Sequence, residues 1–171
     1  SGYVKILHIN SDGSERIVRV VLPGNLFGME ALLGERYEHS AVALTNAHMC
    51  KIPKKIITEL GEESPRLHRQ IVRKWGEALL QSESWFSEIN TGRIEVRLAR
   101  FFLKLAKESG SSAIAPLFKR EDMGLMMDVK FETISRALAS MAELGLISNI
   151  TRLSVQIPSI KALEEFSKKG L

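Results

Sequence analysis

Residues 119–141 read KREDMGLMMDVKFETISRALASM, and this stretch decides the fold of the C-terminal part of the chain. It predicts a short helix over 120–126, a turn at 127–129 and a second helix over 130–144, which together fill the length of a helix-turn-helix. Three apolar side chains recur at helical spacing on the inward face of the second helix: Ile134, Leu138 and Met141. The spacing therefore predicts two packed helices with one face of the second left in solvent.

The outward face of the second helix carries side chains that suit the reading of DNA bases. Glu132, Ser135 and Arg136 fall at i, i+3 and i+4 and share one side. Arg matches the O6 and N7 acceptors of guanine, Glu accepts from the amine of cytosine, and Ser bonds several base edges. Phosphates repel a carboxylate, so Glu132 is better suited to a base edge. Three further side chains are suited by type to phosphates: Lys130, Thr133 and Arg120. From spacing alone, a solvated polar face on an ordinary helical hairpin stays open as the alternative.

Downstream of these helices the pattern changes to short strand-like runs. One run leads out of Gly145, and the other is residues 154–157, with Thr151-Arg152 between them. A helix-turn-helix followed by a small β-hairpin is the winged-helix arrangement. Arg152 at the hairpin tip is then a candidate for a phosphate contact, and the wing favours DNA binding.

Upstream, about 25 residues after Pro65 lack Gly and Pro except for Gly76, which predicts one long helix. Six of its side chains are spaced alternately by four and three: Ile71, Trp75, Ala78, Ser82, Trp85 and Ile89. This is the seam spacing of a two-stranded coiled coil, and a lone helix would expose both tryptophans. A second copy of the chain is the simplest partner; a helix lying on its own β domain is the alternative. After Thr91-Gly92 a further amphipathic helix begins.

The N-terminal part reads as β structure. Strand-like runs at 3–9 and 16–22 flank Asp12-Gly13, a hairpin signal. Residues 40–44 and 48–52 are predicted to form a further strand pair, closed by Pro53. The fold class expected is α+β: a partial β-roll over 1–61, a long dimerisation helix over 62–91, and a winged helix-turn-helix over 92–171.

Composition agrees with an ordinary globular protein of 171 residues, 44% hydrophobic and 26% charged. The net charge of +4 permits a polyanionic partner without requiring one.

A single cysteine cannot form an internal disulfide, and no apolar run reaches membrane-spanning length, so a cytoplasmic location is expected. No catalytic Ser/His/Asp set, motif of paired carboxylates or phosphate loop is recognisable, so an enzyme is not expected. The first residues already read as a strand, which suggests a missing N-terminal part.

The order of β-roll, long helix and winged helix resembles the Crp/Fnr family of bacterial transcription regulators, and the resemblance implies that the partial β-roll over 1–61 is a sensor domain of the cyclic-nucleotide-binding kind. The pieces that carry the resemblance are LPGNLFG at 22–28, RLA at 97–99, REDMG at 120–124 and ETISR at 132–136. The last is the Fnr-type form, with Ser where the Crp type has Gly. The resemblance implies a homodimer that works with RNA polymerase at a palindromic site with half-sites like TTGAT. Phe131 departs from both forms, so its ring either packs on a thymine methyl or holds the helix away.

The resemblance also has implications for the signal that such a regulator would sense. Cyclic-nucleotide-binding members carry Glu after Phe-Gly and an Arg-Ser pair further on, but this chain has Met29 and His39-Ser40 there. Cyclic AMP is therefore not expected. Cys50 falls where Fnr-type members carry one of four cysteine ligands of a 4Fe–4S cluster, and one thiolate cannot hold such a cluster alone. Either the other ligands lie outside this segment, and the signal is oxygen or redox state, or Cys50 is a buried core residue. The alternative function is a small-molecule or cofactor sensor whose winged helix contacts proteins.

Overall fold

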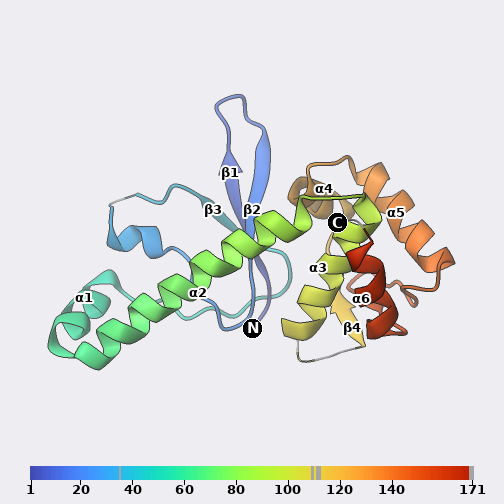
Figure 1. The fold of residues 1–171 in the computed structure, drawn as a ribbon. Coiled ribbons are helices and arrows are strands. Elements are labelled where there is room, and N and C mark those ends of the chain that lie inside the picture. Colours follow the sequence, from blue (N-terminus) through green and yellow to red (C-terminus); the bar gives the residue numbers. More distant parts are fainter. Residues whose placement is uncertain (35, 109, 111–112, 170–171) are drawn as a thin grey trace. The chain divides into compact units, whose positions relative to one another are not determined.

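The computed structural model describes residues 1–34, 36–108, 110 and 113–169. The chain forms two compact units, Ser1–Ser84 and Trp85–Leu171 (Figure 1). Helices and strands occur in both, so the α+β class is confirmed. No helix in the described residues combines the length and the apolar character needed to cross a membrane.

The first unit contains a three-stranded antiparallel sheet in the order β2-β1-β3. Its strands are β1 (Val4–Ile9), β2 (Glu15–Val21) and β3 (Ser40–Ala43). The predicted hairpin between the first two is confirmed: Gly13 has φ +81° at its turn, and the Asp12 carboxylate accepts hydrogen bonds from Ser14 N and Oγ at 2.9 and 2.7 Å. The buried side chains of this sheet and the residue after it are Val4, Leu7, Ile17, Val20, Val21 and Leu22.

The predicted pairing of residues 40–44 with 48–52 is wrong. β3 pairs with β1, with Val4 opposite Ala43 and Leu7 opposite Ser40. Residues 48–52 form no strand, and none of them is buried. His48 N donates instead to Ser1 O at 2.9 Å, so the segment after β3 runs alongside the N-terminus and does not turn back to pair with β3.

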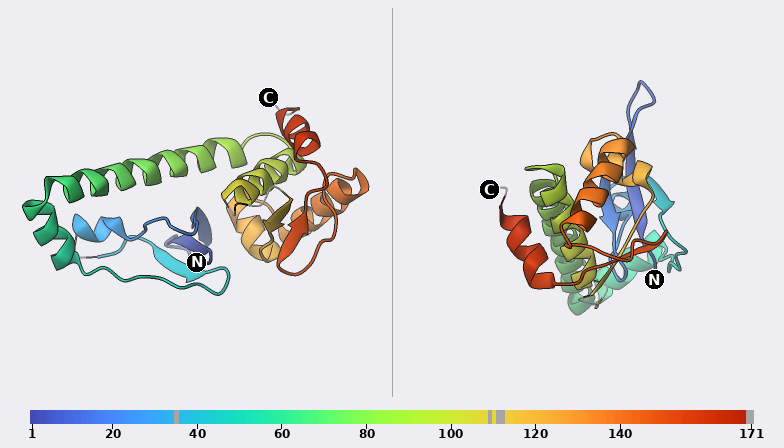
Figure 2. Two further views of the ribbon diagram at one scale, coloured as in Figure 1. Left: turned by 90° about the horizontal axis from the view of Figure 1, so that it is seen from below. Right: turned by 90° about the vertical axis from the view of Figure 1, so that its right-hand side faces the viewer.

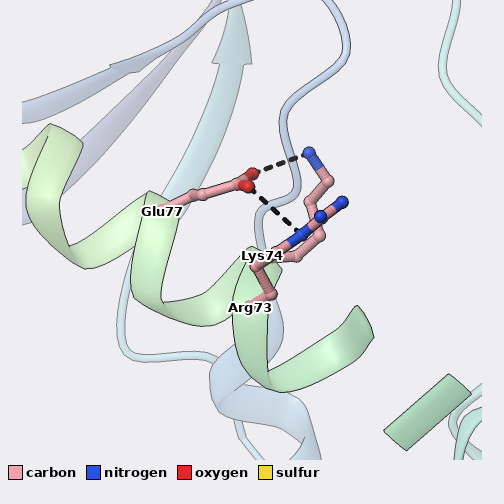
Figure 3. Close-up of polar contacts among 3 residues, drawn as sticks. All are labelled: Arg73, Lys74 and Glu77. Carbon is pink, nitrogen blue, oxygen red and sulfur yellow. Dashed lines mark hydrogen bonds and ion pairs between the residues drawn. The ribbon is translucent and has the colours of Figure 1, made fainter. Parts of the chain in front are cut away.

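Two helices complete the first unit, and a third continues beyond it. α1 (Lys54–Glu63) follows Pro53, and a 3-10 helix, η1 (Met29–Leu32), precedes β3. The predicted long helix is α2 (Pro65–Ile89), unbroken in the left-hand view of Figure 2. Pro65 suits the first helical position because its missing N–H has no acceptor there. Glu77 of α2 accepts from Lys74 Nζ at 2.7 Å and lies 3.5 Å from Arg73 Nε (Figure 3).

The second unit is built on the end of α2 and further elements that surround a core of aromatic rings. Besides the end of α2, the described part of this unit contains the helices α3 (Ile94–Glu108), α4 (Arg120–Met127), α5 (Phe131–Glu143) and α6 (Ile160–Lys168). The Phe101 ring lies 5.6 Å from those of Trp85 and Phe102 and 6.0 Å from that of Phe118. These edge-on contacts join α2, α3 and the chain before α4.

The two strands of the second unit differ from the predicted hairpin. β5 (Ser154–Gln156) pairs antiparallel with β4 (Ile114–Pro116), which lies before the helix-turn-helix. Within the predicted hairpin, Ser148 and Gln156 form an isolated bridge in which each main-chain N donates to the other's O at 2.9 Å. A wing is therefore present, but a strand remote in sequence is the main partner of β5.

Candidate DNA interface

The turn between α4 and α5 depends on Gly124. Main-chain Val129 N donates to Gly124 O at 3.1 Å, and Asp128, which ends α4, has a left-handed φ of 49°. A Cβ on Gly124 would lie 2.6 Å from Val129 O, which is closer than real contacts allow. The glycine lets the turn fold back against α4, and this sets where α5 begins.

α5 is held by the stripe that the sequence predicted. Ile134, Leu138 and Met141 are buried, together with Ala137. On α4 three methionines are also buried: Met123, Met126 and Met127. A helix packed along one whole side presents its other side in a fixed orientation.

The exposed side of α5 brings together the predicted base-reading residues. Phe131, Glu132, Ser135 and Arg136 are all exposed, and Ala139 continues the same face one turn on. Ser135 Oγ donates to Phe131 O at 3.1 Å, so its hydroxyl oxygen remains able to accept. One turn and a half of helix thus presents a guanidinium, a carboxylate, a hydroxyl and an aromatic ring.

The predicted phosphate-contacting residues around this face differ in how exposed they are. Lys130 is exposed directly before α5, and Arg152 is exposed in the wing. Arg120, the first residue of α4, is half-buried, and burial lowers the pKa of its guanidinium while nearby Glu121 raises it. Thr133 is half-buried and lies outside the arc that holds the base-reading residues. The wing itself is stabilised by Thr151, whose Oγ1 accepts from Ser154 N at 3.0 Å.

Arg97, at the start of α3, binds main-chain groups at the ends of two other helices. The sequence did not predict this role. The Arg97 guanidinium donates to the main-chain oxygens of Ile89 and Met127 and, at 3.4 Å, to Asn90 Oδ1. Burial lowers its pKa and the nearby Asp128 carboxylate raises it. The end of α2 and the end of α4 are thereby held by one side chain.

Arg100, one turn further along α3, binds other carbonyl groups. Its Nη1 donates to Glu88 O at 3.1 Å and Thr91 O at 3.0 Å, and its Nε donates to Ser167 O at 3.2 Å. A hollow of about 380 Å³ adjoins these residues between the end of α2, α3 and α6. Arg100 therefore caps the C-terminal end of α2 and joins it to α6.

The predicted seam of α2 needs a correction at its C-terminal end. Trp85 and Ile89 are 6% and 2% exposed, so this chain's own core covers them. Trp85 stacks edge-on against Phe101, with Lys104 Nζ 5.4 Å from the centre of its ring. The spacing indicated that the six residues lie on one face of α2. It could not tell whether a second copy or the chain's own core covers that face. The four seam residues nearer the start of α2 are half-buried: Ile71, Trp75, Ala78 and Ser82.

Cys50 is exposed, so its interpretation as a buried core residue is wrong. Within the described part of the chain, no three or more His, Cys, Asp or Glu side chains are grouped as a metal site requires. A cluster would take one thiolate from Cys50 and every other ligand from elsewhere.

Two family descriptions match this chain. Residues 1–64 match the cyclic nucleotide-binding domain, and residues 96–166 match the Crp-like helix-turn-helix domain. Among curated relatives, the chain is 28% identical to an anaerobic regulatory protein of Pasteurella multocida, over 98% of this chain and 63% of that protein. It is 31% identical to an anaerobic regulatory protein of Haemophilus influenzae, over 86% of this chain and 60% of the relative. The chain thus spans less than two thirds of the length of these relatives.

Solved structures share the fold. FixK2 from Bradyrhizobium japonicum superposes with a TM-score of 0.84 at 19% identity, over 100% of this chain and 86% of that one. A CRP-family transcriptional regulator from Thermus thermophilus superposes with a TM-score of 0.81 at 24% identity, over the same shares. The curated relatives are named as regulatory proteins, and the two matched domains occur in the order that the sequence predicted. This chain belongs to the Crp/Fnr family of transcription regulators.

Proposed function

We propose that this chain is the greater part of a homodimeric transcription regulator that reads a palindromic DNA site through α5. The observation that carries the proposal is the exposed face of α5, where Glu132, Ser135 and Arg136 stand together on a helix buried along its opposite side. The Arg136 guanidinium offers two parallel hydrogen-bond donors, the Glu132 carboxylate offers an acceptor, and the Ser135 hydroxyl can donate or accept. Such a set matches the pattern of base edges in a major groove.

The base-reading roles follow from chemistry. Arg136 bonds the O6 and N7 of a guanine, and Glu132 accepts from the amine of a cytosine. In a half-site like TTGAT, the guanine and the cytosine paired with it supply both groups at a single base pair. Ser135, one turn from Phe131, contacts a neighbouring base edge. Because the carboxylate is repelled by phosphates, Glu132 contributes specificity at some expense of affinity.

Phosphate contacts orient the helix in the groove. Lys130 is exposed at its start and Arg152 is exposed on the wing, while Arg120 and Thr133 are half-buried and present less of their side chains to a phosphate. These residues bind phosphates without reading sequence. Binding is therefore expected to weaken steeply as salt rises, since released counterions contribute less free energy at high salt.

The dimer is proposed to form along α2. Its half-buried residues Ile71, Trp75, Ala78 and Ser82 lie on one stripe, and Val72 and Leu79 beside them are exposed in the single chain. A second copy would cover this apolar surface in the manner of a coiled coil. A two-fold dimer places its two recognition helices about 34 Å apart, one turn of DNA. Such a dimer would work with RNA polymerase in the cytoplasm.

The β-roll is proposed to receive the signal. Cyclic AMP is not the proposed effector, because Met29 and His39 replace the carboxylate and guanidinium that would hold the ribose and phosphate. The relatives include anaerobic regulatory proteins, and Cys50 offers an exposed thiol. Oxygen or redox state is therefore the proposed signal, with an iron–sulfur cluster completed by ligands beyond this segment.

A binding experiment tests the proposal. Fluorescence anisotropy would compare a duplex that carries inverted TTGAT half-sites one turn apart with a duplex of scrambled sequence, over a range of salt concentrations. We expect two chains per duplex, a preference of at least about 1000-fold for the palindrome, and a steep loss of affinity with salt. Equal affinity for both duplexes would contradict sequence-specific reading, and affinity independent of salt would contradict DNA binding.

A further inference from the structure

Phe131 is an aromatic ring left in solvent on a face otherwise polar. Among the aromatic side chains that the structure describes in the second unit, it alone is exposed, with 49% of its surface accessible. Phe166 is half-buried, and the others are buried: Trp85, Phe101, Phe102 and Phe118. The exposed ring leaves apolar surface that a partner can cover, and covering it would favour binding.

The place of Phe131 restricts what that partner is. It is the first residue of α5, next to Glu132 and one turn before Ser135, whose hydroxyl donates to its main-chain oxygen. The first residues of a recognition helix are those that contact base edges. Phe131 therefore lies within the proposed base-reading face and at its leading end.

A phenyl ring carries no hydrogen-bonding group, so it cannot read the donors and acceptors of a base edge. The C5 methyl group of thymine is the apolar feature that a base pair presents in the major groove. Cytosine methylated at C5 presents a methyl at the same position.

We infer that Phe131 reads a C5 methyl group on the base pair beside those contacted by Glu132 and Ser135. This inference rests on the proposed function, since it requires α5 to enter the major groove. Covering one methyl group favours binding by about fourfold per half-site. Two symmetric half-sites give about 15-fold if they contribute independently. The methyl preference makes the outer base of the site a thymine or a 5-methylcytosine.

The test begins with a duplex that the full-length protein recovers from a pool with random central base pairs. Each symmetric pair of thymines is then replaced by deoxyuridine, which keeps every hydrogen-bonding group and removes only the methyl. The wild-type protein is expected to bind about 15-fold more weakly at one such pair, while Phe131→Ala changes by less than about twofold there. Replacing that thymine by cytosine and by 5-methylcytosine is expected to give the wild type a similar preference for the methylated base.

Ser135→Ala provides the matched control on the same face. It weakens binding to the thymine and deoxyuridine duplexes by equal factors, so their ratio stays near that of the wild type. A ratio near one at every thymine in the wild type, or an equal ratio in Phe131→Ala, would overturn the methyl assignment while specific DNA binding persists. Failure to recover any duplex would instead overturn the proposed function.

Discussion

The guanidinium of Arg97 on α3 donates a hydrogen bond to the main-chain oxygen of Met127, the last residue of α4. The same side chain binds Ile89 O at the end of α2. One cation thus satisfies carbonyl groups at the C-terminal ends of two helices, where such groups lack partners within the helix. It ties the helix-turn-helix to the end of α2.

Replacing Arg97 by Met is expected to lower the free energy of unfolding of the second unit by about 2–3 kcal/mol, because the two carbonyls lose a charged donor. The sequence holds two tryptophans, so a Trp75→Phe background leaves buried Trp85 as a fluorescent reporter of urea unfolding. Arg93→Met is the control, since the Arg93 side chain is 86% exposed and faces Glu95 at 3.8 Å. It should cost less than about 0.5 kcal/mol. Equal losses in both variants would show that the tie contributes nothing.

Substitution of two glycines by alanine is expected to act in opposite directions. Gly124→Ala places a Cβ 2.6 Å from Val129 O, so it should destabilise the protein by about 1–3 kcal/mol. Gly76→Ala, within α2, meets nothing within 4 Å and should stabilise it by about 0.5–1 kcal/mol through helix propensity. Thermal unfolding followed by circular dichroism measures both. A stabilising Gly124→Ala would show that the turn does not need the close approach.

The proposed seam of α2 predicts a change of oligomeric state in Trp75→Glu. A charge inserted among half-buried apolar residues should give monomers, because a buried unpaired carboxylate is costly. Sedimentation velocity measures the state, and the emission of Trp85 reports whether the second unit stays folded. Arg69→Glu, an exposed position on the same helix, serves as the control and should remain dimeric. Dimers in both variants would place the interface elsewhere.

The pKa of Glu77 is held below its ordinary value of 4.5, first by the hydrogen bond from Lys74 and also by the charges of Lys74 and Arg73. Lys74→Ala should therefore raise it, and Arg73→Ala should raise it less, as a carboxyl NMR titration would record. Since the folded pKa is lowered, the contribution to stability is present above the unfolded pKa and is lost as pH falls through the folded pKa. An unchanged pKa in Lys74→Ala would show that the pair does not form in solution.

Features set by local spacing were predictable, and features set by tertiary contacts were not. Ile134 and Leu138 lie one helical turn apart, so the buried stripe of α5, and with it the exposed reading face, followed from the sequence. The spacing of Trp85 within α2 was equally regular, but spacing does not tell whether a second copy or Phe101 covers the ring. The tie between Arg97 and Met127 joins residues 30 positions apart, and no periodicity indicates such a contact.

The strands show the same difference between features set by local sequence and features set by tertiary contacts. The β1-β2 hairpin needed only a turn signal at Asp12-Gly13, which is local. The partners of β3 and β5 are strands more distant in sequence than the nearest candidates. None of the four residues of β3 is buried, so its own pattern does not indicate β1 as the partner, and β5 likewise pairs with a strand that precedes the helix-turn-helix.

The central claim, that the exposed face of α5 reads bases, is tested most directly by Arg136→Ala. Its affinity and that of the wild type would be measured for the palindromic duplex and for a scrambled duplex at one salt concentration. The account predicts a loss of about 1–3 kcal/mol on the palindrome, with relaxed specificity at one position, and a change within about threefold on the scrambled duplex, where only the backbone is contacted. Unchanged affinity for the palindrome, or equal losses on both duplexes, would contradict it.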